Sequence, residues 1–454
     1  MRPGASPLLR LFYGCSRGRP LVIGHGSDGA TALFDMPGFV VGALVVDDGE
    51  WWLLIETTAD RVGCRSCGVR AVGHGRRRVE VRDLPIAGRP VRLVWSKRIW
   101  RCVEPACTIS TWSEQHAQIA ARASLTGRAR IEICRRVGED ADSVAQVARE
   151  FGIGWHTAMA AVREHGDRLV DDPNRLGAPS ALGLDETSFL RAGPKHPRIM
   201  ITGFVDLDRH QLLDVAEGRS GQVVRDWLDD RPSEWVAQVD VAVIDPFRGY
   251  ATGLTDRLDA TIVVDHFHAI RLANKAIDDA RRRVQQETLG HRGRRDDPLY
   301  RIRRRLLVGH ERLTDQQHER ILTMLGHGDR HGDVTATYLA KELLRDVYDA
   351  QTVRAARRRL CRFYEHCDQT GVRECRRLAR TIRAWEAEVL AFHTTGRSNG
   401  PTEGINLLIK KVKRVGHGFR NFNNYRLRLL LHCGVQWHTA PTARVRGRQP
   451  RLIA

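Results

Sequence analysis

The spacing of apolar residues divides the chain into four regions that differ in periodicity. Residues 36–115 contain short runs that alternate apolar and polar positions, which is typical of half-buried strands. In residues 120–170 apolar residues recur every three or four positions, as in amphipathic helices. Residues 180–270 mix short apolar runs with helical stretches, and residues 271–394 show helical spacing alone. Together with the length of 454 residues, this pattern predicts an α/β protein with several domains.

The mixed region has a definite order of strands and helices. Three strands are expected in succession, then a helix at about 220–228, and then two further strands that are each followed by a helix. This is the order of a ribonuclease-H-like domain with a mixed sheet. A segment at 395–436 is expected to complete the domain. The expected strands cover residues 181–184, 199–207, 211–216, 241–244 and 261–264.

The region 271–394 is far too long to be a loop within that domain. Its pattern predicts an all-helical insertion, and its many Arg and Lys residues give it a basic face. Such a face either contacts DNA or another subunit, or is a solvated surface of alternating charge. Helices are expected at 270–284, 306–325, 337–349 and 353–364.

Both ends of the chain lack a periodic pattern. Residues 1–35 are expected to be disordered or to precede a true start at Met36, and residues 437–454 form a basic tail. No apolar run reaches the roughly 18 residues that span a bilayer, and the first segment is too broken for a secretory signal. We therefore expect a cytoplasmic protein without a membrane partner.

The net charge of the chain indicates a class of binding partner. The chain carries 73 Lys and Arg residues against 54 Asp and Glu residues, a formal net charge of +19. Such a charge attracts polyanions, and the release of their counterions favours binding. Nucleic acid is therefore the favoured partner class, and a basic protein without such a ligand is the alternative.

Four of the ten cysteines stand in two short knuckles. Two residues separate Cys64 from Cys67, and four separate Cys102 from Cys107. Four thiolates from two turns suit a tetrahedral Zn²⁺ ion, and a cytoplasmic chain disfavours disulfides. Between residues 76 and 101 the chain also holds nine Arg and Lys residues, which favours phosphate contact. The alternative is that the four are unconnected buried thiols, as we expect of Cys15, Cys134, Cys361, Cys367, Cys375 and Cys433.

Residues 143–163 carry the pattern of a helix-turn-helix. Ser143 caps a first helix, Gly152 provides a turn, and a second helix begins at about Trp155. An ordinary helical hairpin is the alternative for so short a pattern. In a helix-turn-helix, the outward-facing side chains that contact DNA would be Trp155, His156, Thr157 and Arg163.

Carboxylates follow two of the expected strands, at Asp185 and Asp245. Phosphoryl transfer with two metal ions needs acids that converge at adjacent strand ends, and the first and fourth strands of this topology lie side by side. A third acid has to come from a helix, and Glu403 is the candidate because a Ser-Asn-Gly-Pro stretch opens a helix just before it. The three acids are expected to hold Mg²⁺ or Mn²⁺. The following turns carry cations suited to DNA phosphates, which are Lys410, Lys411, Lys413 and Arg414.

Asp265 is the alternative to Asp245 as the second acid, since it also ends an apolar run. Asp245 is preferred because the fifth strand of this topology lies one place further from the first. His266 and His268 have the spacing of metal ligands, but structural or phosphate-contacting roles are more common for such residues. Glu186 points to the opposite face of the strand from its neighbour Asp185, which favours a structural role.

These motifs resemble those of the bacterial insertion-sequence transposases of the ISL-three type, within the larger group with Asp-Asp-Glu active sites. The resemblance covers residues from about 36 to 436 and is most specific between Ser398 and Arg426. One departure is Phe247, where the family more often has Met or Trp, and it leaves Asp245 in place. The resemblance implies a zinc-ribbon-like module at 36–115, a helix-turn-helix at 120–170, and a ribonuclease-H-like catalytic domain at 180–270 and 395–436.

The resemblance also implies a function. The chain would be a nucleoid-associated bacterial DNA transposase that binds the terminal inverted repeats of an insertion sequence and catalyses metal-dependent strand cleavage and strand transfer. Asp185, Asp245 and Glu403 would be its metal-binding acids, and a homodimer on double-stranded DNA would join element ends to a target. The alternatives are a DNA-binding regulator with a catalytically silent core and a nuclease that cuts without joining.

Overall fold

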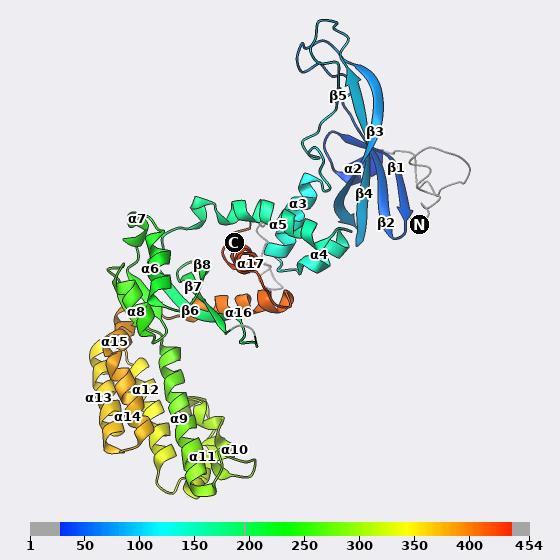
Figure 1. Ribbon diagram of the computed structural model, residues 1–454. Coiled ribbons are helices and arrows are strands. Elements are labelled where there is room, and N and C mark those ends of the chain that lie inside the picture. The colour runs from blue at the N-terminus through cyan, green and yellow to red at the C-terminus, as the bar shows by residue number, and fades with distance from the viewer. Residues whose placement is uncertain (1–27, 195–196, 438–454) are drawn as a thin grey trace, which may run out of the picture. The chain divides into compact units, whose positions relative to one another are not determined.

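A computed structural model describes residues 28–194 and 197–437 of the chain. These residues form two compact units (Figure 1). The first unit contains the chain up to Arg175 together with the chain from Val412 onward, and the second unit is Leu176–Lys411. Cys15, the predicted tail beyond residue 437 and most of the segment 1–35 lie outside the described residues.

The first unit begins with a five-stranded sheet in the order β1-β2-β4-β3, with β5 paired to β4. The long hairpin of β3 and β4 turns at Ala87 and Gly88, whose φ angles are 49° and 74°. Positive φ at both positions gives the two-residue turn whose twist matches that of the flanking strands. The strands are β1 (Phe39–Asp47), β2 (Glu50–Thr57), β3 (Val72–Ile86), β4 (Arg89–Arg101) and β5 (Thr111–Ser113).

A short helix, α2 (Asp28–Phe34), packs on this sheet. Phe34 and Met36 are buried in the same apolar core as Trp95, and the N–H of Val41 donates to the Thr31 hydroxyl at 3.1 Å. The predicted disorder of residues 1–35 is therefore wrong for residues 28–35. The segment is too short to show a period, and its order comes from contacts with strands that follow it.

Four further helices lie in the first unit within the described residues. Ser143 caps α4, since its hydroxyl accepts a hydrogen bond from the N–H of Gln146 at 3.2 Å. Gly152 has a φ of 62° in the turn between α4 and α5, and both helices begin where the sequence predicted. The helices are α3 (Gly127–Gly138), α4 (Val144–Glu150), α5 (Trp155–Val170) and α17 (Phe422–Cys433).

Helix α17 corrects the predicted domain division, which placed residues 395–436 together in the catalytic domain. It packs against α3 and α5 of the first unit. A Cβ on Gly166 of α5 would lie 2.9 Å from the Cδ1 of Leu431, so the glycine lets the two helices approach closely. The Arg428 guanidinium donates to the carbonyl of Asp142, 286 residues earlier, at 2.8 Å. Sequence order hides such a contact, which explains the error.

The second unit contains a five-stranded sheet in the order β10-β9-β6-β7-β8. Strand β7 pairs antiparallel with both β6 and β8, whereas β9 pairs parallel with both β6 and β10. The predicted mixed α/β architecture is therefore confirmed. Strand β6 runs further than expected, so Asp185 lies within a strand rather than after one. The strands are β6 (Ala181–Leu190), β7 (Ile199–Asp206), β8 (Gln211–Glu217), β9 (Val241–Ile244) and β10 (Thr261–Val264).

Helices share a continuous apolar core with this sheet. The ring of Phe204 in β7 stacks on Trp227 of α6 with centroids 4.0 Å apart, and Trp227 in turn meets the edge of Trp235 in α7. These aromatic contacts fix the helices over one face of the sheet. The helices that accompany the strands are α6 (Gly221–Asp229), α7 (Ser233–Val236), α8 (Arg248–Thr255) and α16 (Gly400–Val415).

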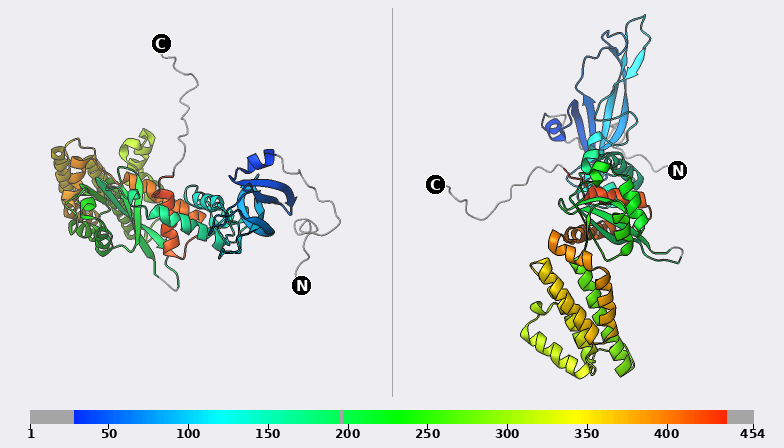
Figure 2. Two further views of the ribbon diagram at one scale, coloured as in Figure 1. Left: turned by 90° about the horizontal axis from the view of Figure 1, so that it is seen from above. Right: turned by 90° about the vertical axis from the view of Figure 1, so that its left-hand side faces the viewer.

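The insertion before α16 is helical, and Figure 2 shows its longer helices side by side. The single helix predicted at 306–325 is wrong, because two 3-10 turns at Arg305–Leu307 and His310–Arg312 precede α11. Thr314 and Gln317 form a capping box that starts α11 afresh. The insertion helices are α9 (His266–Leu289), α10 (Pro298–Ile302), α11 (Asp315–Gly328), α12 (Asp333–Tyr348), α13 (Val353–Gln369), α14 (Arg373–Ala384) and α15 (Glu386–Thr395).

None of the helices in the described part of the chain combines the length and the apolar character that crossing a bilayer requires.

Part of the basic stretch of the first sheet forms ion pairs within that sheet. Arg82 pairs with Glu50 at 2.9 Å, and Arg92 pairs with Glu80 at 2.8 Å. Less of its charge is therefore available for phosphates than the sequence suggested.

Candidate active site and cysteine cluster

The four knuckle cysteines converge at one end of the β3–β4 hairpin. The Sγ atoms of Cys64, Cys67, Cys102 and Cys107 all lie within 4.8 Å of one another, with 3.7 Å between Cys64 and Cys107 and 3.5 Å between Cys67 and Cys102. Sulfur atoms at about 2.3 Å from a tetrahedral Zn²⁺ ion would be about 3.8 Å apart. The cluster therefore fits a structural zinc ion.

Local backbone geometry builds the first knuckle. The N–H of Cys64 donates to the carbonyl of Val69 at 2.8 Å, and the N–H of Gly68 donates to Cys64 at 2.9 Å. Gly68 has a φ of 75°, which a side chain would disfavour. Backbone N–H groups of Cys67 and Ser66 lower the pKa of the Cys64 thiol to about 7, whereas burial and neighbouring thiols raise the pKa values of Cys67 and Cys102. Without a cation the cluster therefore favours one thiolate rather than four.

Two acids meet on adjacent parallel strands of the second unit. Asp185 lies in β6, and Asp245 follows the last residue of β9. Since Gly183 pairs with Val243 across these strands, the two carboxylates lie at the same edge. His268 from the first turn of α9 joins them, and the ligand atoms of the three residues lie within 4.8 Å of one another. The Nδ1 of His268 is 2.5 Å from Asp245 Oδ2.

Glu403 lies in a second group that shares His268. Its carboxylate, Asp265 and His268 also have ligand atoms within 4.8 Å of one another. Asp265 follows β10, one strand beyond Asp245, as the predicted strand order requires. Asp185 and Asp245 thus share one group while Glu403 and Asp265 share the other, and the predicted three acids do not make up a single group among the described residues.

The start of α16 packs directly on β6, which positions Glu403. A Cβ on Gly183 would lie 2.3 Å from the Thr402 hydroxyl oxygen and 2.8 Å from Asn399 Oδ1, so only glycine permits this approach. The N–H of Asn399 donates to Asp265 at 2.9 Å, and its side-chain amide donates to the carbonyl of Leu184 at 3.2 Å. These bonds tie the helix start to two strands.

Asn399, Thr402 and Asn406 had no role predicted from the sequence. Asn406 donates to the Asp185 carboxylate, one helical turn beyond Glu403. Residues three apart on a helix face the same way, so this spacing was a usable signal once Glu403 was chosen. Glu186, expected to be structural, pairs with Arg219 at 3.0 Å.

The site concentrates negative charge away from water. Burial, together with the nearby charge of Asp245, raises the pKa of Asp185 to about 6. Burial opposes the protonation of His268, but its contact with Asp245 raises the pKa of the imidazole. Carboxylates held this close repel each other unless a proton or a cation lies between them.

Several buried oxygen atoms of the site have no hydrogen-bond partner within the described residues, although buried polar atoms usually have one. Oxygen ligands suit Mg²⁺ and similar hard cations, and a bound ion would satisfy these atoms. The residues therefore fit a divalent metal. The atoms that belong to the acids of the two groups are Asp245 Oδ1 and Asp265 Oδ2, and Asn399 Oδ1 and Thr402 Oγ1 lie at the start of α16.

The predicted DNA-contacting residues lie outside the acid cluster. Trp155 and His156 are exposed at the start of α5, and Thr157 is half-buried. Arg163 is engaged within the first unit, where its guanidinium donates to Asn424 Oδ1 at 2.8 Å. On α16, Lys410, Lys411 and Arg414 are exposed and Lys413 is half-buried.

The family of the chain follows from comparison with known proteins. The model of a transposase family, the ISL3 group of the DDE type, matches residues 182–429. The chain belongs to this family. The match includes every acid of the candidate site. A second model, the zinc finger of the transposases of IS204, IS1001, IS1096 and IS1165, matches residues 60–107 and so covers all four knuckle cysteines.

The curated relatives of the chain have names that agree with this family. The chain is 25% identical over 386 residues to the transposase for insertion sequence element IS1001 of Bordetella parapertussis, covering 83% of this chain and 90% of the relative. It is 26% identical over 300 residues to the transposase for insertion sequence element IS1557 of Mycobacterium tuberculosis, covering 62% of this chain and 66% of the relative. The expected family is thus confirmed.

Proposed function

We propose that this chain cuts and joins DNA strands at the ends of an insertion sequence. The observation that carries the proposal is the buried acid cluster, in which Asp185 and Asp245 meet on adjacent parallel strands and His268 links them to Glu403. Metal-dependent phosphoryl transfer needs such convergence of carboxylates. Membership of a transposase family supports DNA as the substrate.

The architecture supports the finer structural assignments. Three antiparallel strands followed by two parallel ones are consistent with a ribonuclease-H-like core, interrupted by the helical insertion. The capped helix α4, the glycine turn and α5 are consistent with a helix-turn-helix. The cysteine cluster and these two helices would then form the modules that bind double-stranded DNA.

Asp185, Asp245 and Glu403 would hold Mg²⁺ or Mn²⁺, and Asp265 is a further ligand candidate because it shares a group with Glu403. Ions held there would supply activation of water and stabilisation of the attacking and leaving oxygens of a phosphodiester. His268 orients Asp245, and Asn406 orients Asp185. With this chemistry no Ser or Tyr nucleophile is needed.

Exposed cations and polar residues would hold the DNA. Lys410, Lys411, Lys413 and Arg414 would contact phosphates. At the start of α5 the contacts would come from Trp155, His156 and Thr157, since Arg163 is held by Asn424. Joining requires two element ends to be held together, so we infer a homodimer on the element ends and the target.

An in-vitro cleavage assay tests the proposal. The substrate is labelled DNA that carries the inverted repeats flanking the gene, with Mg²⁺, and the variant is Glu403→Gln. We expect nicking at the repeat boundary by wild type and a loss on the order of 10³-fold in the variant, because a ligand carboxylate is removed. The matched control is Glu365→Gln, which changes an exposed glutamate of α13 and should cleave normally.

The outcomes separate the alternatives. Binding without nicking by wild type would contradict the catalytic proposal and favour a regulator with a silent core. Nicking without strand transfer would favour a nuclease. Full activity of Glu403→Gln would exclude Glu403 as a metal ligand.

A further inference from the structure

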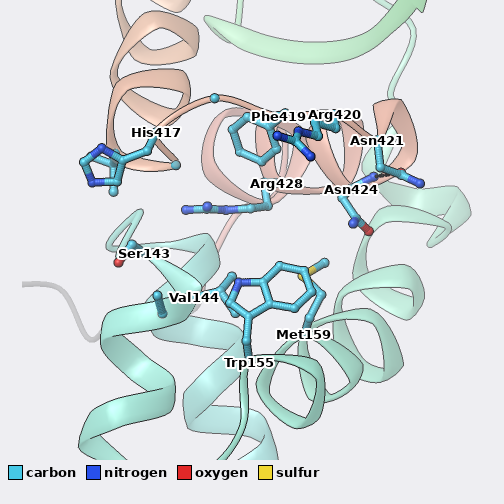
Figure 3. Close-up of a pocket in the computed structure, with 14 residues that line it drawn as sticks. Ser143, Val144, Trp155, Met159, His417, Phe419, Arg420, Asn421, Asn424 and Arg428 are labelled. Atoms are coloured by element: carbon cyan, nitrogen blue, oxygen red, sulfur yellow. Dashed lines mark hydrogen bonds between the residues drawn. The ribbon is translucent and has the colours of Figure 1, made fainter.

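A pocket in the first unit lies between the start of α5 and the segment from Val415 to Arg428 (Figure 3). Its volume is about 350 Å³, within the range of pockets that hold small organic groups. The stretch around Gly418 is part of the most specific motif of the sequence, yet the proposed chemistry gives it no role. The pocket is distinct from both metal clusters.

An exposed tryptophan forms one wall. Trp155 is the first residue of α5 and is 42% exposed, which is unusual for so large an apolar side chain. Met159, one turn later, lies behind it and is buried. The indole therefore lines the pocket and remains partly open to solvent.

A tight turn brings a second aromatic residue to the pocket. His417 and Gly418 have positive φ angles of 50° and 96°, and a Cβ on Gly416 would lie 2.6 Å from the ring of Phe419. Glycine at 416 thus lets Phe419 fold back toward α17, where its ring packs on Tyr425 with centroids 4.8 Å apart.

Arg428 supplies a buried cation in the pocket. Figure 3 shows its side chain between Phe419 and Trp155, and it is only 3% exposed. One guanidinium nitrogen donates to the carbonyl of Asp142 at 2.8 Å, but its Nε has no hydrogen-bond partner among the described residues. An unsatisfied buried donor of this kind favours a ligand with an acceptor atom.

The charge of the residues that line the pocket disfavours a cationic ligand. None of the described lining residues is acidic, whereas His417 and Arg420 are exposed at the pocket. The site therefore combines an exposed aromatic side chain, an unsatisfied donor and the exposed cation of Arg420. A planar, acceptor-bearing group attached to a polyanion has the complementary properties.

From this geometry we propose that the pocket receives a nucleobase displaced from the DNA helix, which stacks on Trp155 beside Arg428. The proposal rests on the proposed function, because it assumes that the chain binds DNA. Stacking a base on an aromatic side chain is worth roughly 5- to 150-fold in affinity. Displacing a base from a perfect duplex is costly, and an unpaired base is the easiest to capture.

The test compares two duplexes in binding to the full chain. One is perfectly paired, and the other carries one extra, unpaired thymidine at its centre. We expect wild type to prefer the bulged duplex by about 10-fold. Trp155→Ala should lower this preference to near unity, and Trp155→Phe should restore part of it. The readout is the ratio of two affinities, so a general loss of DNA binding in a variant does not mimic the effect.

A second variant fills the pocket and leaves its aromatic residues in place. Ala145 lies exposed in the lining, and Ala145→Phe should abolish the preference by occupying the space. The matched control is Leu169→Ala, which truncates an exposed apolar side chain outside the pocket on α5, the helix that carries Trp155, and should keep the preference. Permanganate reactivity of the bulged thymine should fall on binding to wild type and stay high with Ala145→Phe.

The possible failures are distinguishable. Absence of binding to either duplex would contradict the proposed function and this inference together. Equal binding of both duplexes by wild type, or an unchanged preference in Trp155→Ala and Ala145→Phe, would overturn the base pocket alone. Competition by free thymidine monophosphate as strong as that by the bulged duplex would also overturn it, since a free nucleotide would then be the occupant.

Discussion

At the scale of single residues, the acid cluster holds carboxylates so close together that their negative charges repel each other. Asp185 is half-buried, Asp245 is buried beside it, and the Oδ1 of Asp245 lacks a hydrogen-bond partner among the described residues. His268 offsets part of the charge through its contact with Asp245. A site arranged in this way is destabilising to the fold without a bound cation and gains stability when one binds.

The pKa of Asp185 makes the destabilising effect of this repulsion on the fold measurable. The carboxyl titrates at about 6 in the folded chain, against about 3.9 in an unfolded one. Its protonation therefore favours the folded state: the stabilisation is complete below about pH 4 and is lost as the pH rises through about 6. Asp185→Asn removes the charge. We expect it to raise the free energy of unfolding at pH 7.5, with chelator present, by up to about 3 kcal/mol and to change it little at pH 4.

Urea denaturation at the two pH values, with and without Mg²⁺, checks the prediction. Mg²⁺ should stabilise wild type but not Asp185→Asn. The control is Asp259→Asn, an exposed position of the same unit, which should behave as wild type. An equal gain at pH 4 and pH 7.5 would show that Asp185 does not titrate in this range.

Some site residues were predictable one at a time and others were not. Asp245 and Asp265 each follow a short apolar run, so their place at strand ends could be inferred from local pattern. Asp185 also follows such a run, but its strand continues to Leu190, so only its proximity to the other acids could be inferred. Asn399 has no such signal, and Asn406 has one only through its spacing from Glu403, because the hydrogen bonds of both depend on where α16 lies over the sheet. His268 was ambiguous since spacing alone does not distinguish a ligand from the partner of one.

At the scale of elements, the contact between α16 and β6 is the junction on which the site depends. Gly183→Ala would place a methyl group 2.3 Å from the Thr402 hydroxyl and 2.8 Å from Asn399 Oδ1, so the helix start has to shift. Overpacking of this kind costs about 1–3 kcal/mol. The shift would move Glu403 as well, and cleavage should fall on the order of 100-fold.

Gly203→Ala is the matched control, because the same change in β7 meets no atom closer than 3.8 Å. Urea denaturation and the cleavage assay should show Gly203→Ala close to wild type in both properties. Wild-type cleavage by Gly183→Ala would mean that the position of α16 tolerates the methyl group and does not control the site.

Elements were predicted best where one local signal determines them. The strands β9 and β10 and the cap of α4 at Ser143 are such cases. The segment 306–325 has apolar residues at helical spacing on both sides of Gly309, yet the chain breaks there and restarts at Thr314. Helical periodicity depends only on the spacing of apolar residues and contains no information about the competing N-cap at Thr314. One continuous helix was expected for this reason.

At the scale of the whole molecule, the first unit is assembled from both ends of the chain. Helix α17 packs on α3 and α5, and Leu427, Leu430 and Leu431 are all buried. No sequence pattern within 422–433 indicates which partner covers these residues, because a helix that is apolar on most sides is compatible with any core. The domain division could therefore be predicted only up to α16.

This assembly predicts two units that respond to different perturbations. Leu431 is fully buried in the first unit, so Leu431→Ala should destabilise that unit by about 2–5 kcal/mol, whereas Mg²⁺ should stabilise only the second unit, which holds the acids. Calorimetry should resolve two transitions, one lowered by Leu431→Ala and the other raised by Mg²⁺. Leu407→Ala, at a position of α16 that is 66% exposed, should leave both in place. If both perturbations instead moved a single shared transition, the two units would unfold as one cooperative body, and binding of DNA ends and metal chemistry would be coupled through folding.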